Sequence, residues 1–442
     1  MKKSTKKLLV FWLIALPFLV GWSFYWLRVN KGLDNLSGKS QEIRAIYKIW
    51  DKLAQKDGQE RSFLVLLQND MELRPGGGYI GTFGILKIKD GDLVSFETHN
   101  TNTFDGRVPD GTPTPYPMPE MLRIKDWKMR DANWFPDWKD SAQKAEYFYH
   151  AGQGQEEFEG IIGINTQLLE TFLTMTGPIK LENVPEEFKE DNAIIRLEEL
   201  VEQDYKDIGN THGERKRIVY DLGMAILRKV KDFSYSQKLE LAGKIEEELQ
   251  KKNIQLYFKD QELESLAVQN KWAGKVESSW ENDYLMFIDA NLGALKSNHK
   301  MKYQAEYVID LSKEKPTAEL TFSQSHTAKE KDWMTKDYQG YLRIYAPKEA
   351  WLLNGGDFSQ IKFSEEYDKK VFGTQVFTKL GTTDSFRFVY TLSPELKNKP
   401  YKLLIQKQSG MKDMPVKIKL IRENGEVQEK EIILDRDQIV EF

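Results

Sequence analysis

Two short stretches of this chain gather charged residues and glycines in patterns that suit ligand binding. The first, NDMELRPGGGYIGTFGIL at 69–86, places Glu72 and Arg74 just before three consecutive glycines. Glycine tolerates positive φ and lets a backbone approach a ligand closely, so the stretch predicts a binding loop with opposite charges at its rim. The glycines are Gly76, Gly77 and Gly78. A tight connection between two strands is an equally good interpretation, because glycine runs are common in turns.

The second stretch, MRDANWFPDW at 129–138, follows neither helical nor strand periodicity. It combines two tryptophans with four polar residues, which are Arg130, Asp131, Asn133 and Asp137. The presence of this second polar stretch shifts the balance for the first stretch from a plain turn towards a ligand site.

Together the two stretches resemble a bacterial family known as domain of unknown function 4012. The resemblance lies in ELRPGGGYIG at 72–81 and RDANWFPD at 130–137. It continues in EGIIGINTQLLETFLTMTGPIKL at 159–181 and FIDANLGALKS at 287–297, so it spans most of the chain after residue 60. The family implies an architecture and a location at the cell surface.

Residues 8–28 predict a transmembrane helix. LLVFWLIALPFLVGWSFYWL contains no charge and is about 20 residues long, which is the length that crosses the hydrocarbon core of a bilayer. Lysines in the tail at 1–7 keep the amino terminus in the cytoplasm by the positive-inside rule. A cleaved signal peptide would need a small-residue cleavage site, whereas bulky residues follow here. We therefore expect a single-pass protein of the cell membrane with most of its chain outside the cytoplasm.

The composition of the 442 residues agrees with a folded extracytoplasmic part. Hydrophobic residues make up 40% and charged residues 30%, which suits two or three globular domains. Because no cysteine occurs, disulfides and thiolate metal sites are excluded. The formal net charge of −4 gives no indication of nucleic-acid binding.

The pattern beyond the anchor predicts three further regions. Apolar residues at helical spacing indicate a helical stalk, or the first helix of the next domain, within 29–60. Buried strands such as SFLVLL alternate with amphipathic helices at 61–274, which predicts an α/β sandwich. Runs with a period of two at 275–442 predict an antiparallel β-sandwich.

The chain is also distantly similar to the LytR-CpsA-Psr group, whose membrane-anchored enzymes move glycopolymers from polyprenyl pyrophosphate carriers onto the cell wall. The similarity rests on the single anchor, the order of strands, the segment at 159–181 and the helix opening GERKRIVYDLGMAIL. It places Arg215 or Arg217 near the group's pyrophosphate-binding arginine. It also matches Arg74 with the first-strand arginine, and Arg130 with Asp131 as the second arginine–aspartate pair.

This similarity implies a site for a prenyl-linked glycan. Arginine forks bind pyrophosphate through bidentate, charge-assisted hydrogen bonds, and nearby acids would hold Mg²⁺ or deprotonate an acceptor hydroxyl. We therefore expect catalytic roles for Arg74, Arg130 and Asp131, Mg²⁺ at Asp70 and Asp137, and ligand contacts at the remaining residues. Those remaining residues are Glu72, Gly76, Gly77, Gly78, Asn133, Arg215 and Arg217.

Two alternatives stay open. The charged residues could form ion pairs that fasten loops to a sheet, with Arg74 joined to Glu72, and Arg130 to Asp131 or Asp137. The protein would then be a non-catalytic envelope protein that binds glycan, prenyl lipid or another surface protein. In either case its expected partners are the lipid bilayer and, for the transferase, a polyprenyl pyrophosphate-linked glycan and a cell-wall polymer.

Overall fold

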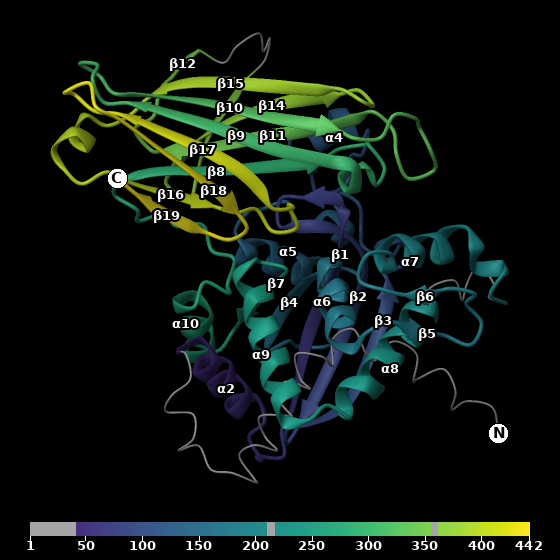
Figure 1. Cartoon of the computed structure of the whole chain (residues 1–442). Coiled ribbons are helices and arrows are strands. Elements are labelled where there is room, and N and C mark those ends of the chain that lie inside the picture. Colours follow the sequence, from purple (N-terminus) through teal and green to yellow (C-terminus); the bar gives the residue numbers. More distant parts are fainter. Residues whose placement is uncertain (1–40, 210–216, 355–360) are drawn as a thin grey trace, which may run out of the picture. The chain divides into compact units, whose positions relative to one another are not determined.

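The structure, a computed structural model, describes residues 41–209, 217–354 and 361–442 (Figure 1). These residues divide into two compact units. Unit 1 contains the described residues up to Gln68, together with Ile80–Pro109 and Trp138–Gly274. Unit 2 contains Asn69–Tyr79, Asp110–Asp137 and Lys275–Phe442. The region predicted as a sandwich therefore shares its unit with two earlier segments, which hold most of both motif stretches.

The predicted cytoplasmic tail at 1–7 and transmembrane helix at 8–28 lie outside the described residues. Among the helices that are described, none combines the length and the apolar character needed to cross a membrane.

Unit 1 is built on a mixed five-stranded sheet in the order β3-β2-β1-β4-β7. Its strands are β1 (Glu60–Arg74), β2 (Gly77–Lys89), β3 (Asp92–Asn100), β4 (Gly160–Asn165) and β7 (Ile254–Phe258). β1 runs parallel to β4, with Phe63 opposite Gly160, whereas β2–β3 and β4–β7 are antiparallel pairs. The apolar residues 63–66 of β1 are fully buried, as expected for a central strand covered on both faces.

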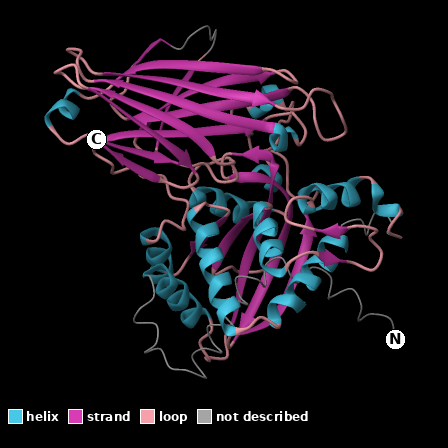
Figure 2. Ribbon diagram, viewed as in Figure 1, coloured by secondary structure: helices cyan, strands magenta, loops and turns pink. Residues whose placement is uncertain are grey.

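Helices cover both faces of this sheet, as Figures 1 and 2 show. The helices are α2 (Gln41–Leu53), α3 (Thr101–Asp105), α5 (Trp138–Ala151), α6 (Gln167–Thr176), α7 (Ala193–Glu202), α8 (Arg217–Lys231), α9 (Tyr235–Gln250) and α10 (Gln261–Gln269). The main core of unit 1 lies between one face and helices α6 to α10, and Trp50 of α2 belongs to it. α2 is thus the first helix of a domain, the second of the two possibilities that its sequence allowed. On the opposite face, Gln143 of α5 donates a hydrogen bond to the Tyr257 hydroxyl of β7.

Short elements complete unit 1. They are the two-stranded sheet of β5 (Ile179–Lys180) and β6 (Glu187–Phe188), and the 3₁₀ turn η3 (Asp204–Lys206).

Unit 2 consists mainly of two six-stranded sheets, drawn as magenta arrows in Figure 2. The first has the order β12-β15-β10-β9-β17-β18 and the second the order β13-β14-β11-β8-β16-β19. The strands are β8 (Asp283–Asn291), β9 (Met301–Asp310), β10 (Thr317–His326), β11 (Tyr338–Pro347), β12 (Leu352–Asn354), β13 (Lys362–Glu366), β14 (Lys369–Thr378), β15 (Thr383–Thr391), β16 (Lys402–Gln406), β17 (Met414–Ile421), β18 (Val427–Leu434) and β19 (Gln438–Glu441). Short helical elements are α4 (Met118–Met121), η2 (Met129–Asp131), η4 (Ser297–Lys300) and η5 (Pro394–Asn398).

One hydrophobic core joins the two sheets of unit 2. In β9 the residues at Met301, Tyr303, Ala305, Tyr307 and Ile309 are buried and alternate with more exposed neighbours, as the period of two predicts. Most strand pairs are antiparallel, but β8–β16 and β9–β17 are parallel. The sandwich is therefore mixed rather than purely antiparallel. The prediction of a mixed α/β chain with several sheets is confirmed.

Candidate functional site

The glycine stretch forms a tight hairpin in the structure, because only Pro75 and Gly76 separate β1 from β2. A Cβ atom on Gly78 would lie 2.2 Å from the Asn69 carbonyl carbon, so the approach of the two strand backbones requires glycine there. Gly77 has φ 140° and packs against Gly410, where a Cβ would lie 2.8 Å from the Gly77 carbonyl oxygen. Gly77 and Gly78 thus serve backbone packing within unit 2, which agrees with the strand-connection interpretation for these two residues.

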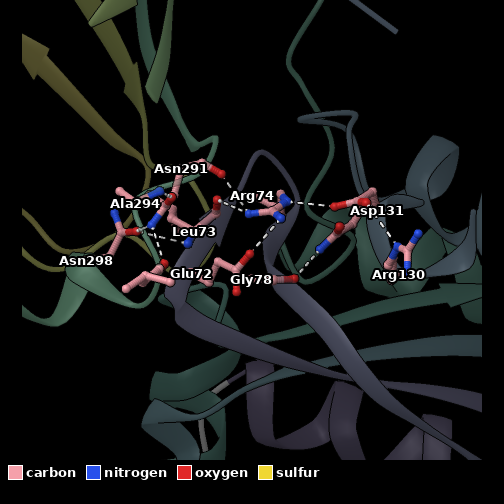
Figure 3. A network of polar contacts seen from close by, with 11 residues as sticks. Glu72, Leu73, Arg74, Gly78, Arg130, Asp131, Asn291, Ala294 and Asn298 are labelled. Atoms are coloured by element: carbon pink, nitrogen blue, oxygen red, sulfur yellow. Dashed lines mark hydrogen bonds and ion pairs between the residues drawn. The ribbon is translucent and has the colours of Figure 1, made fainter. Parts of the chain in front are cut away.

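The Arg74 side chain is the centre of a buried polar network, shown in Figure 3. Its exposed fraction is 2%. Nε donates to Asp131 Oδ1 at 2.9 Å, and Nη2 donates to Glu72 Oε1 at 2.9 Å. Nη1 donates to the carbonyl oxygens of Asn291 at 2.8 Å and Leu73 at 3.3 Å. Two acids and two carbonyl groups of the protein therefore already surround the guanidinium group.

The charges of this network stabilise one another. Burial alone would lower the pKa of Arg74, but the adjacent carboxylates of Asp131 and Glu72 hold it above the ordinary arginine value. Burial raises the pKa of Glu72, although the neighbouring Arg74 charge opposes that shift. The two acids and the arginine thus form one coupled cluster in which Arg74 remains charged.

The second motif stretch joins the first through this cluster. Besides the contact of Asp131 with Arg74, Asn133 Nδ2 donates to the Gly78 carbonyl oxygen at 2.7 Å. The Gly76 amide donates in return to the Asn133 carbonyl oxygen at 2.9 Å. Arg130 lies at the outer rim, where its Nε is 3.8 Å from Asp131 Oδ2 and its side chain is 32% exposed. The structure thus brings together Glu72, Arg74, Arg130, Asp131, Asn133 and the glycines within unit 2.

Residues outside the two motif stretches supply partners that the sequence did not assign to a role. Asn291 gives Arg74 a carbonyl acceptor, and Asn298 Oδ1 accepts a hydrogen bond from the Leu73 amide at 3.1 Å. The Gln408 side chain donates both to the Arg74 carbonyl oxygen and to the Asp289 carbonyl oxygen. The available signal was the motif FIDANLGALKS, where polar residues interrupt an apolar run that is buried throughout.

Asp289 itself belongs to a buried cluster beside these partners. Its Oδ2 accepts hydrogen bonds from the hydroxyls of Tyr338 at 2.6 Å and Tyr303 at 2.9 Å. Burial raises the pKa of Asp289 to about 6, although these two hydrogen bonds act in the opposite direction. Asp283, at the other end of β8, accepts from the hydroxyls of Tyr401 and Tyr307, and burial likewise raises its pKa to about 6.

The two acids predicted to hold Mg²⁺ are buried in unit 2. Asp137 Oδ2 accepts a hydrogen bond from the Val276 amide at 3.0 Å, and Asp70 lies beside Gly410. In the part of the chain that the structure describes, only Glu146, His150 and Glu157 bring three metal-capable ligand atoms within 4.8 Å of one another. Neither Asp70 nor Asp137 takes part in such a group, so Mg²⁺ binding stays a prediction.

Of the two predicted helix arginines, the one that the structure describes is not part of the network. Arg215 lies outside the described residues. Arg217 begins α8 in unit 1, where its side chain is 55% exposed and its Nε is 3.8 Å from Asp221 Oδ2. This geometry is that of a solvated helix surface.

The fold defines a two-unit protein, with a helix-covered mixed sheet in one unit and a β-sandwich in the other. Residues 58–201 match the sequence model of the family described as "protein of unknown function (DUF4012)". The resemblance to this family that the motifs predicted is therefore confirmed for that segment. None of the curated proteins matches the chain.

Among solved structures, similarity is weak. The Lin1025 protein of Listeria innocua is 14% identical, with 49% of this chain and 79% of that chain covered and a TM-score of 0.25. A protein described as the transcriptional regulator yvhJ of Bacillus subtilis is 13% identical, with 54% and 87% covered and a TM-score of 0.26. A protein described as nutrient-binding, from Legionella pneumophila, is 7% identical with a TM-score of 0.21; 31% of this chain is covered, and the chain spans 54% of that protein's length. At such TM-scores these likenesses carry no conclusion about function.

Proposed function

We propose that this protein is a membrane-anchored, extracytoplasmic protein of the bacterial cell envelope that binds a glycan or its prenyl-linked precursor without transferring it. The anchor rests on the uncharged run at 8–27, and the ligand class rests on the sequence similarity to the glycopolymer-transfer group. Another surface protein is the alternative partner.

The burial of Arg74 carries the non-catalytic part of this proposal. A transferase of the expected kind would use this guanidinium group to bind pyrophosphate, yet it is 2% exposed and donates to Asp131, Glu72 and two carbonyl groups. Withdrawing it from a buried partner would leave a carboxylate without its counter-charge, at a cost of about 3–5 kcal/mol. The Arg74–Asp131 pair therefore suits a scaffold better than a ligand site.

The transferase is the second candidate, and the rim of the network favours it. Glu72 has a side chain 26% exposed and a pKa raised by burial, which suits a general base, and Arg130, which is 32% exposed, lies at the same rim beside Asp131. In that case Arg130 would bind a phosphate group and Glu72 would accept the proton of an acceptor hydroxyl.

One experiment separates the two. The full-length protein in detergent is mixed with a glycan-loaded polyprenyl pyrophosphate carrier and Mg²⁺, and both carrier binding and release of polyprenyl phosphate are measured. Arg130→Ala is compared with Arg123→Ala, since Arg123 is an exposed arginine of the same unit. We expect binding without release.

The other outcomes decide against the proposal in different ways. Mg²⁺-dependent release that Arg130→Ala abolishes and Arg123→Ala preserves would establish the transferase. Neither release nor binding would remove the carrier as a ligand and leave a surface protein as the partner to be sought.

A further inference from the structure

A separate group of side chains in unit 1 has the composition of a metal site. Glu146 and His150 lie one helical turn apart on α5, so they project from the same face. The chain then turns back and brings Glu157 to them, and one ligand atom from each residue lies within 4.8 Å of the other two. None of these residues takes part in the Arg74 network.

The histidine of this group is oriented as metal-binding histidines usually are. His150 Nδ1 lies 3.3 Å from the Gly154 carbonyl oxygen, which can accept its proton. The other ring nitrogen, Nε2, then carries the lone pair and lies 3.8 Å from Glu146 Oε1. A backbone carbonyl that fixes the tautomer of a ligand histidine is the common arrangement around protein-bound metals.

The central carboxylate is paired with a partly exposed cation. Glu146 Oε1 is itself buried from solvent. Its nearest cation is the Lys259 ammonium group, with Nζ at 2.7 Å and a side chain that is 41% exposed. The oxygen is thus already paired with a cation, and a divalent ion would replace this partly exposed lysine.

We propose that Glu146, His150 and Glu157 bind a divalent transition metal of the Zn²⁺ class. One imidazole and two carboxylates are a ligand set that Zn²⁺ accepts, with water completing a four-coordinate shell, whereas Mg²⁺ and Ca²⁺ prefer oxygen ligands alone. Without Lys259 the group carries two negative charges, which matches a divalent ion. When no metal is present, the Lys259 ammonium group supplies the positive charge beside Glu146. The metal ion and the lysine therefore compete for the Glu146 carboxylate. This proposal is independent of the proposed glycan binding.

Zn²⁺ binding by full-length protein, purified without a histidine tag and treated with chelator, tests the proposal by calorimetry. His150→Ala and Glu157→Gln should each weaken binding by more than the roughly 10-fold loss typical of an outer-shell change. The matched control is Glu159→Gln, because Glu159 is an exposed acid two residues from Glu157, and its variant should bind like the wild type. Lys259→Gln should bind more tightly than the wild type because the competing ammonium group is gone.

Two further readouts keep the result unambiguous. Zn²⁺ should raise the unfolding temperature of the wild type but not of His150→Ala. Co²⁺ should give visible absorption bands that the same variant lacks. Wild-type binding that persists unchanged in His150→Ala, or that Lys259→Gln weakens, would overturn the proposal.

Discussion

The charged cluster around Arg74 in unit 2 and the cluster around Glu146 in unit 1 both contain acids paired with a cation. They differ in how far that cation is enclosed by the protein. Arg74 is enclosed, and its donors meet two carboxylates and two carbonyl groups. Glu146 is paired at 2.7 Å with the ammonium group of Lys259, whose side chain is 41% exposed, and lies 3.8 Å from His150. A charged cluster that is enclosed within the protein stabilises the fold, whereas one whose cation is partly exposed can exchange that cation for a ligand.

Removing the arginine is the strongest way to test this contrast. Arg74→Ala would leave Asp131 buried without its counter-charge, so we expect the free energy of unfolding of unit 2 to fall by about 3–5 kcal/mol. Urea unfolding followed by tryptophan fluorescence would measure it. Arg123→Ala, at an exposed position of the same unit, should change the value by no more than about 0.5 kcal/mol. Equal effects of the two variants would show that the Arg74 cluster does not hold the fold.

The buried aspartates of β8 predict how the stability of unit 2 depends on pH. Because the folded pKa of Asp289 is raised to about 6, its protonated form contributes stability below pH 4, and this contribution is lost as the pH rises through 6. The loss amounts to at most about 3 kcal/mol for a shift of this size. Unfolding measured from pH 4.5 to 7.5 should therefore show unit 2 losing stability relative to Asp289→Asn, whose amide mimics the protonated acid.

A parallel pH dependence in the wild type and in Asp289→Asn would contradict this assignment. Asp283 carries the same shift from the same cause, so the double variant with Asp283→Asn should flatten the profile further.

The hairpin glycine gives the next effect in size. Gly78→Ala would place a methyl group 2.2 Å from the Asn69 backbone, which cannot move as a flexible side chain does. Overpacking of this kind costs about 1–3 kcal/mol. Gly243→Ala is the matched control, because nothing lies within 4 Å of its Cβ position inside α9 and alanine should stabilise that helix by up to about 1 kcal/mol. Opposite signs in thermal unfolding are expected, and a neutral Gly78→Ala would show that the glycines are not required for packing.

The smallest effect is expected at the helix surface. Arg217→Ala removes an exposed contact of 3.8 Å to Asp221, and surface pairs of this kind are worth less than about 1 kcal/mol. The same unfolding assay should barely distinguish it from the wild type. A loss of unfolding free energy as large as that of Arg74→Ala would contradict the assignment of Arg74 as enclosed and structural and of Arg217 as solvated.

Sequence patterns predicted the regular parts of both units for a physical reason. The apolar run in β1 and the alternation in β9 are local consequences of burial on two faces or one. The same reasoning predicted only the strand SFLVLL, whereas β1 continues to Arg74. A strand is not expected from its sequence to continue through acids and an arginine. Those residues can be buried only because Asp131, 57 positions away, and Asn291, 217 positions away, satisfy Arg74.

The candidate site shows the same limit. The residues of the Arg74 network stand in the two motifs that the sequence singled out, and the possibility of ion pairs between them was part of the prediction. Their enclosure depends on β8 and Gln408, which a local pattern does not connect to them. The Glu146 group was missed because its third ligand follows a turn after the helix, although the spacing of Glu146 and His150 on α5 was a visible signal.

Carrier binding by the double variant Arg74→Met/Asp131→Leu tests the central claim most directly. Apolar residues of similar size can replace a buried ion pair with little loss of stability, so the variant should fold where Arg74→Ala alone is weakened. If the pair is a scaffold, the folded double variant binds the prenyl-linked glycan as the wild type does. A double variant that unfolds like the wild type yet no longer binds, or that loses a Mg²⁺-dependent release present in the wild type, would show that Arg74 belongs to the functional site.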